Sequence, residues 1–396
     1  MADRRTGPGG TARIRVATAA AYVVAGAVHL LTAGLLLGGV LLIVLGFETV
    51  VQPMLGLALV IMALVLRPRL GRLDPDLPTL TRADAPTLFE LLDRIADAVG
   101  VRRLDAVQLT TEFAATVFPY GFFRKRRLVL GVPLWAAHSP QQRVAVLARA
   151  MADLDPGHVR RGVFVGMALR SLTTGANLMR SDGRAVVFGI GLAEARHAAD
   201  VMEGALRFNA RTRASEWALW LPRVAVTATA RLLLWLTRPA AHRALLAADD
   251  TAARTASTEA VIAVLRDRCL ARAVIVETHR LAIEARTVVR DRSAKAPPEV
   301  DLWDRVARHA AGLREQRGGD PSAEPGAPGT PFEVAGRPSD ALRIQRLANA
   351  PDHPAAITVD EPGRTRIEDE LRPAADAVAR QVMRDGVPLA YEPAAH

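Results

Sequence analysis

The residues best placed to do chemistry lie on a helix predicted for the stretch Ser139 to Asp155. Arg149 and Asp153 are four residues apart, so they stack on one helical face with Ala150 beside them. A guanidinium group stays cationic and has no lone pair for a metal, whereas a carboxylate can bind either a cation or a metal. One carboxylate does not make a metal site, because a zinc site needs about three or four protein ligands. The residue types on this face therefore favour ion pairing over catalysis.

Histidine and cysteine, the usual zinc ligands, follow no metal-binding pattern in this chain. Cys269 is the one cysteine, so it has no partner for a cysteine-based zinc motif or for an intramolecular disulfide, and it fits a reducing compartment. A helical zinc motif needs two histidines four residues apart, and no pair among the nine histidines has this spacing. They are His29, His138, His158, His197, His242, His279, His309, His353 and His396.

The helix that carries Arg149 has a well-marked start. Ser139 can cap it, Pro140 suits the first helical position, and Gln142 completes a Ser-x-x-Gln capping box. Apolar residues recur at helical spacing and predict the buried stripe, namely Val144, Leu147, Met151 and Leu154. This stripe leaves Arg149 and Asp153 on a neighbouring face.

Two apolar runs near the N-terminus predict a membrane hairpin over residues 17–69. Tyr22 to Phe47 carries no charge and exceeds the roughly 20 residues that a transmembrane helix needs. It is also longer than the apolar region of a signal peptide, which has about 7–15 residues. Met54 to Leu66, extended by Thr49 to Val51, can form a second and shorter span. Arginines flank the pair on both sides and none lies in the turn, so the positive-inside rule predicts a multi-pass cell-membrane protein whose main domain is cytoplasmic.

Composition supports a membrane association and indicates possible anionic partners. Half of the residues are hydrophobic although 23% are charged, and the net charge is +10. Only Lys125 and Lys295 among the 51 basic residues are lysine. Such a charge suits anionic lipid or nucleic acid. The basic cluster Arg124 to Arg127 favours a solvated turn or a membrane-surface contact over nucleic-acid binding.

The rest of the chain predicts a mainly α protein with a small β-sheet, an α+β fold. Residues 1–16 are expected to be a disordered basic segment, residues 70–316 a main domain, residues 317–330 a flexible linker, and residues 331–396 a C-terminal helical part of that domain. The segment near 214–236 combines tryptophans and leucines with arginines and predicts an amphipathic, membrane-associated stretch. Pro222 is expected to kink any helix there.

Individual elements follow from periodicity. Helices are expected over Asp84 to Val99, through most of Ala240 to Arg290, and over Val300 to Arg314 and Thr365 to Gly386. Two further helices are expected over Val163 to Leu178 and Leu192 to Leu206. Strands are expected over Arg103 to Thr111 and Arg127 to Val132, with an aromatic loop between them.

This order of elements resembles the HtpX-like and CAAX-prenyl-protease-type membrane zinc endopeptidases. In that family the central helix carries L-A-H-E-L-G-H, and the matching run here is Leu147 to Asp153. The resemblance implies a zincin-like domain in which Arg149 and Asp153 replace the two histidine ligands. Ala150 replaces the glutamate that acts as the general base.

The resemblance also extends to two later segments. The run His242 to Asp249 matches the helix that supplies the third ligand, so the ligand glutamate falls on Leu245 and only the trailing Asp249 is kept. Arg337 stands where the family tends to have the histidine of a His-Pro pair, and Arg343 matches an arginine that follows it. The resemblance further implies that the region between the two strands is an edge strand and loop along the substrate cleft. Zinc is the cofactor of the family, but we expect none here.

These observations predict a membrane-anchored, catalytically inactive relative of the peptidases. It would bind the lipid bilayer and could hold peptide segments or another membrane protein in the old cleft. Arg149 could occupy the place of zinc and bridge Asp153 and Asp249, or it could form an ordinary helical ion pair with Asp153. Two alternatives remain: an active metalloendopeptidase whose metal is held by Asp153 and Asp249, and a membrane scaffold that binds anionic lipid or, less favourably, nucleic acid.

Overall fold

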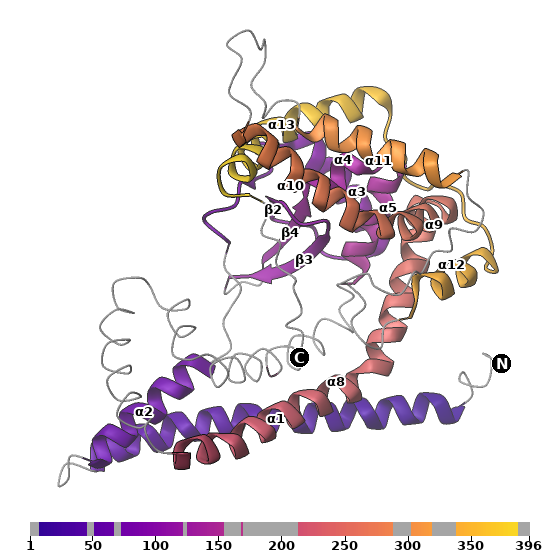
Figure 1. The fold of residues 1–396 in the computed structure, drawn as a ribbon. Helices are drawn as coiled ribbons and strands as arrows, with labels where there is room; N and C mark the ends of the chain where they lie inside the picture. The colour runs from indigo at the N-terminus through magenta and orange to yellow at the C-terminus, as the bar shows by residue number, and fades with distance from the viewer. Residues whose placement is uncertain are drawn as a thin grey trace. The chain divides into compact units, whose positions relative to one another are not determined.

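The computed structural model describes residues 8–45, 51–66, 73–121, 125–153, 168, 213–287, 302–318 and 338–386. The chain divides into two compact units, one formed by residues 1–69 with 159–241 and the other by residues 70–158 with 242–396. The described part is mainly helical with one small mixed sheet (Figure 1), which confirms the α+β fold class. Apart from residue 168, the two expected helices between residues 163 and 206 lie outside the described residues, as does the site position Arg337.

The described part of the first unit consists of three helices. Helices α1 (Pro8–Leu45) and α2 (Val51–Leu66) pack on each other, and α8 (Arg213–Ala256) contributes its first half. Leu233 and Leu236 of α8 share an apolar cluster with Ala21, Ala25 and Val28 of α1. The two N-terminal helices approach closely where two glycines meet, because a Cβ on the glycine at position 56 would lie 2.6 Å from the carbonyl oxygen of the glycine at position 39.

One stretch of α1 is long and apolar enough to cross a membrane. It covers Val16–Leu45, with 30 residues and a mean hydropathy of 2.5, and most of its surface is not buried within the protein. At about 1.5 Å per residue it exceeds the ~30 Å thickness of a bilayer core. The apolar part of α2, Val51–Leu64, is shorter than a usual span.

One expectation for this unit needs correction. Helix α1 begins at Pro8, so residues 8–16 belong to a helix and not to a disordered segment. Alanine and arginine are good helix formers, and extending an existing helix is easier than starting one. Helix α8 runs from Arg213 to Ala256 and includes Pro222. A proline removes one hydrogen bond from a helix, and a long helix can tolerate that loss.

The second unit contains a four-stranded sheet in the order β1-β2-β4-β3. Its strands are β1 (Thr79–Leu80), β2 (Ala106–Thr110), β3 (Ala115–Tyr120) and β4 (Lys125–Gly131). Strands β2 and β4 are parallel, and β3 runs antiparallel to β4 with Val117 opposite Leu128. The two expected strands are therefore present. The loop expected between them is largely β3, an edge strand, as the family resemblance implied.

Buried leucines place the core of this unit on one face of the sheet. Leu109, Leu128 and Leu130 are each at most 2% exposed, and they share a face because Leu109 pairs with Leu130. Helices α3 (Pro86–Val99), α4 (Val132–Ala137) and α5 (Pro140–Ala152) follow the strands closely in the chain. Helix α5 packs on β3 and on α3, and α4 packs on β4, so the sheet positions the helix that carries Arg149.

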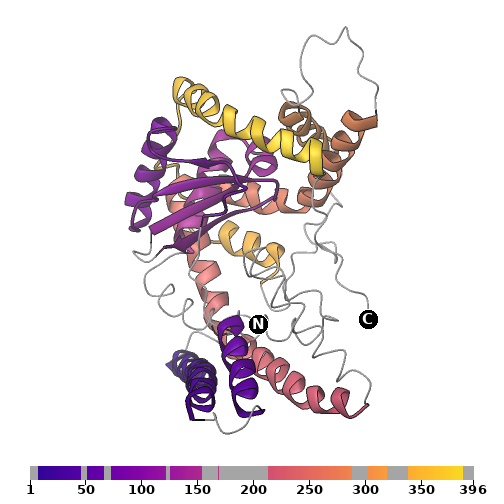
Figure 2. The same ribbon diagram turned by 90° about the vertical axis from the view of Figure 1, so that its left-hand side faces the viewer.

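The remaining helices complete the second unit. They are the end of α8, α9 (Thr258–Asp267), η3 (Arg268–Leu270), α10 (Ala271–Thr287), α11 (Leu302–Gly318), α12 (Asp340–Ala348) and α13 (Glu361–Asp385). Figure 2 shows the yellow helix α13 running across the top of this unit, where it contacts α3 and β2. The carboxylate of Glu370 on α13 accepts hydrogen bonds from the backbone N–H groups of Thr87 and Leu88, and so caps α3. Helix α11 extends to Gly318, two residues into the expected linker.

Candidate functional site

The helix that carries Arg149 begins as its sequence predicts. Ser139 and Gln142 form a reciprocal capping box, and Pro140 occupies the first turn. Val144, Leu147 and Met151 are fully buried, while Leu154 lies outside the described residues. Because this stripe fixes the rotation of α5, the side chain of Arg149 points from a neighbouring face toward α8.

Asp249, near the end of α8, is the centre of the site. Its side chain is only 1% exposed, and Arg343 of α12 is equally buried. The Nε of Arg343 donates to Oδ2 of Asp249 at 2.7 Å, and its Nη2 donates to Oδ1 at 2.6 Å. This is a two-pronged pair between a planar guanidinium and a carboxylate, the geometry that gives the strongest charge-assisted hydrogen bonds. Ser339 caps α12 and so fixes where Arg343 enters the site.

Arg149 of α5 also contacts the carboxylate of Asp249. Its Nε lies 3.1 Å from Oδ1 of Asp249, and its side chain is 19% exposed. This Nε is buried and makes no hydrogen bond within the described part of the chain, so the contact is an ion pair without hydrogen-bond geometry. Burial, followed by the positive charge of Arg343, lowers the pKa of Arg149 to about 10, while the charges of Asp249 and Asp153 oppose this effect. Arg149 therefore remains cationic at neutral pH.

The charged network continues outward from Arg343. Its Nη1 donates to Oδ1 of Asp340 at 2.6 Å, and the same oxygen receives Nη1 of Arg268 at 2.7 Å. Four segments, α5, α8, η3 and α12, are thus tied together by alternating charges. We call Arg149, Asp249, Arg268, Asp340 and Arg343 the arginine–aspartate network.

The residues at this site do not fit zinc. Arg149 and Ala150 cannot supply a ligand or a general base, and Leu245, at the position of the third ligand, is apolar and 9% exposed. Asp153 sits exposed at the C-cap of α5. No group of three histidine, cysteine, aspartate or glutamate side chains that could hold a metal ion occurs among the residues that the structure describes.

Strand β3, on which α5 packs, is the outermost strand of the sheet within the described residues, and its hydrogen bonds to β4 follow a defined pattern. The carbonyl of Ala114 accepts from the N–H of Gly131, so residues 114, 116, 118 and 120 face β4. By alternation the backbone groups of Ala115, Val117 and Pro119 face away from the sheet. Pro119 has no N–H to offer, which is the usual place for proline on an edge strand. The N–H groups of Ala115 and Val117 therefore point away from β4, and Val117 as a whole residue is 6% exposed.

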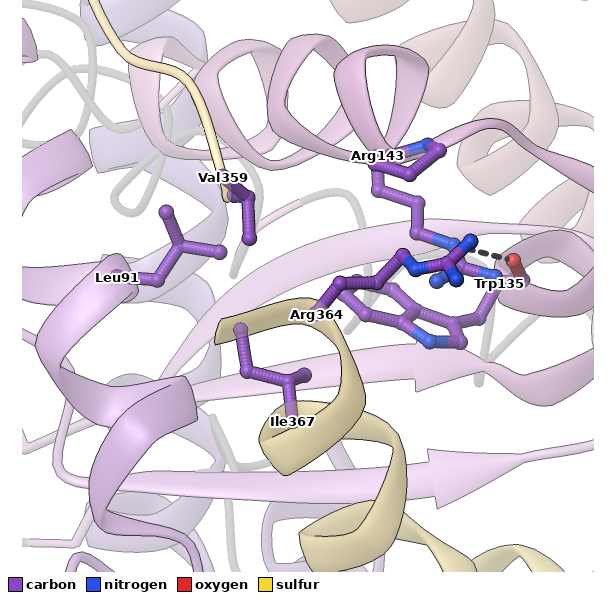
Figure 3. Close-up of a pocket in the computed structure, with 7 residues that line it drawn as sticks. Leu91, Trp135, Arg143, Val359, Arg364 and Ile367 are labelled. Carbon is purple, nitrogen blue, oxygen red and sulfur yellow. Dashed lines mark hydrogen bonds between the residues drawn. The ribbon is translucent and has the colours of Figure 1, made fainter. Parts of the chain in front are cut away.

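A small pocket elsewhere in this unit is explained by packing (Figure 3). It lies between α3, α4, α5 and the start of α13, and its lining includes Leu91, Val359 and Ile367. The guanidinium of Arg143 stacks 4.7 Å from the ring centre of Trp135, and its Nε donates to the Trp135 carbonyl at 2.9 Å. Its Nη1 also donates to Glu368 at 2.9 Å. Arg143 thus joins three helices, and the apolar lining leaves little room for chemistry.

Some of the predicted site residues meet and others do not. Arg149, Asp249 and Arg343 come together, and Asp153 acts on Arg149 as a nearby negative charge. The sequence reasoning missed Asp340 and Arg268. The three-residue spacing of Asp340 and Arg343 behind a serine cap is a signal that could have found the first. No local pattern points to Arg268, because its partner lies on another helix.

Comparison with known proteins adds no relative. No protein-family model matches the chain, and neither a curated protein nor a solved structure matches it.

Proposed function

We propose that this chain is a membrane-anchored, catalytically inactive relative of zinc endopeptidases that binds extended peptide segments. The observation that carries the proposal is the ion pair of Arg149 with Asp249 at 3.1 Å. These residues stand in the two helical segments that the resemblance aligned with the metal-binding helices. Their contact supports the alignment, because it brings together two segments that lie far apart in the sequence.

The chemistry of the site supports binding more than hydrolysis. A zinc peptidase needs a metal to polarise the peptide carbonyl and a base to take a proton from water. Here the positive charge is that of the guanidinium groups of Arg149 and Arg343. These groups donate hydrogen bonds, but they cannot lower the pKa of a bound water as zinc does. Ala150 provides no base. The function left for such a site is to hold a peptide without cutting it.

We propose that the outer edge of β3 holds the peptide. An extended peptide can add a strand to a sheet edge, where backbone hydrogen bonds give affinity. The outward groups of Ala115 and Val117 suit a short segment of about four or five residues, because each donor serves two residues of a strand. The proposed partner is therefore an extended segment of another protein.

The anchor is proposed to be the helical hairpin of α1 and α2. One span in α1 is long enough to cross a bilayer, and the close glycine contact keeps α2 beside it. We place the second unit in the cytoplasm on the distribution of arginines that flank the hairpin. The bilayer is then the first partner of the protein.

Two measurements on detergent-purified protein test the lack of catalysis. The chain is purified without chelators or a histidine tag, and its zinc content and its cleavage of casein are measured. We expect zinc far below one ion per chain and no cleavage. Stoichiometric zinc, or cleavage that is abolished by Asp153→Asn, would refute the proposal and favour an active enzyme.

Peptide binding at the edge strand is tested with a matched pair of variants. Ala115→Pro removes an outward N–H and should weaken the binding of a fluorescent, extended valine-threonine peptide. Pro119→Ala adds an outward N–H and should leave binding unchanged or make it tighter. If both variants bind the peptide as the parent does, the edge of β3 is not the binding surface.

A further inference from the structure

We infer that one face of α8 lies on the cytoplasmic surface of the bilayer, and that Arg231 and Arg238 bind the phosphate groups of anionic lipids there. This inference rests on the membrane anchor of the proposed function. It adds a class of lipid and the residues that recognise it, and it concerns only the part of α8 that belongs to the first unit.

The first support is the composition of the α8 face that points away from α1. Four side chains share this face because they follow the spacing i, i+3, i+4 and i+7, namely Arg231, Leu234, Trp235 and Arg238. The leucines of α8 that pack on α1 lie on the other side of the helix. Leu234 is 47% exposed and Trp235 is 65% exposed, and both arginines are exposed as well. Tryptophan and arginine beside apolar residues are typical of a helix in the headgroup region.

The second support is that the two arginines have no acidic partner. Within the described part of the chain, neither Arg231 nor Arg238 forms an ion pair. The sequence of α8 also has no acidic residue between Glu216 and Asp249, so none of its neighbouring turns supplies a carboxylate. A lipid phosphate would provide the missing negative charge, and its oxygens suit the planar fork of a guanidinium.

The third support is the level at which the hairpin leaves the membrane. Gly39 of α1 approaches Gly56 and Val60 of α2, which sets the register of the two antiparallel helices. Because both helices rise by the same amount per residue, Leu66 at the end of α2 lies opposite about residue 30 of α1. Arginines follow α2 directly in the sequence and mark this level as the cytoplasmic headgroup region.

Helix α8 meets α1 on the cytoplasmic side of that level. The α1 residues in the shared apolar cluster are Ala21, Ala25 and Val28, all of which precede residue 30. The length of α1 agrees, since a bilayer core takes only about 20 of the 30 residues in Val16–Leu45. An arginine is costly in the hydrocarbon core but is attracted to an anionic surface. At this level the apolar side chains of α8 can enter the lipid while its arginines reach the phosphates.

The test measures which lipid touches Trp235. The full chain is placed in vesicles of phosphatidylcholine and phosphatidylglycerol, with bromine on the acyl chains of one lipid or the other. The fluorescence of Trp235 is the difference between the parent and Trp235→Phe. Quenching by each brominated lipid gives their relative affinity at this face. We expect phosphatidylglycerol to be preferred at least about fivefold at low salt. Replacing both arginines, Arg231→Gln with Arg238→Gln, should remove the preference while Trp235 is still quenched.

The matched control is Arg254→Gln, which removes an exposed arginine from the part of α8 that belongs to the second unit. The preference for phosphatidylglycerol should be unchanged in this variant. A preference that survives the double arginine variant would refute the role of the two arginines.

An alkaline carbonate wash of the vesicles separates this inference from the anchor. If the chain stays in the membrane but both lipids quench Trp235 equally, the inference is overturned and the anchor stands. If the chain stays but neither lipid quenches Trp235, this face of α8 does not lie on the bilayer, and the inference is again overturned. Release of the chain by the wash would overturn both the anchor and the inference.

Discussion

The buried pair of Arg343 and Asp249 leads to a prediction about stability. Replacing Arg343 with methionine keeps an unbranched but shorter side chain and leaves Asp249, at 1% exposure, with only the contact to Arg149, which lacks hydrogen-bond geometry. Removing one partner of a buried ion pair costs about 3–5 kcal/mol, because the remaining charge has lost its solvation and its partner. Arg149→Met should cost only about 1 kcal/mol, since Asp249 keeps both bonds to Arg343 and Arg149 is partly exposed.

The loss of stability can be measured as a decrease in the melting temperature. For a domain of about 150–250 residues, 1 kcal/mol shifts the melting temperature by roughly 2–4 °C, so Arg343→Met should lower it by roughly 6–20 °C. Thermal unfolding in detergent, followed by circular dichroism, measures both variants under one condition. Combining Arg343→Met with Asp249→Asn should recover part of the loss, because the double variant no longer buries a carboxylate that has lost its main partner.

Two outcomes would refute this reasoning. If Arg149→Met destabilised the chain as much as Arg343→Met, Asp249 would depend equally on both arginines, and the two-pronged pair with Arg343 would not be its main contact. If Arg343→Met left the melting temperature unchanged, Asp249 would not be buried and paired as the structure shows. Equal loss in the single and double variants would mean that Arg343 acts through packing and not through its charge.

Three further predictions concern other parts of the chain. Gly56→Ala should separate α1 from α2 and make the hairpin more sensitive to protease, because its Cβ would lie 2.6 Å from a backbone oxygen of α1, whereas Gly34→Ala, which meets nothing within 4 Å, should have no effect. Ser257 has a φ of 130° and caps α9, so Ser257→Gly, which relieves the strain, should melt higher than Ser257→Ala, which keeps the strain and loses the cap. Burial lowers the pKa of His138 below its ordinary value of 6.5. The unfolded chain therefore binds one more proton than the native chain as the pH falls below 6.5, and the free energy of unfolding should decrease from pH 7.5 to pH 5.5. His138→Asn should make that decrease smaller.

Local chemistry accounts for the parts of the fold that could be predicted. The capping box at Ser139 and the buried stripe of α5 depend on neighbours within one or two turns, so the pattern is complete in the sequence. Strand β3 was harder to recognise from its own residues. Its aromatic residues and Pro119 also suit a loop, and only pairing with β4 selects the strand. Helix α4 is only six residues long, too short to show a helical period.

The amino-acid sequence by itself determined the absence of the zinc-binding motif, the apolar run of α1 and the face of its helix on which Arg149 lies. Each of these follows from residue type and spacing along one segment. The tertiary structure decided which charge Asp249 binds. Arg343 reaches it from a helix 94 residues away, and this choice depends on how α8 and α12 pack. More than one arginine lies near Asp249. Only the packing of the helices places one guanidinium, that of Arg343, in line with both carboxylate oxygens of Asp249.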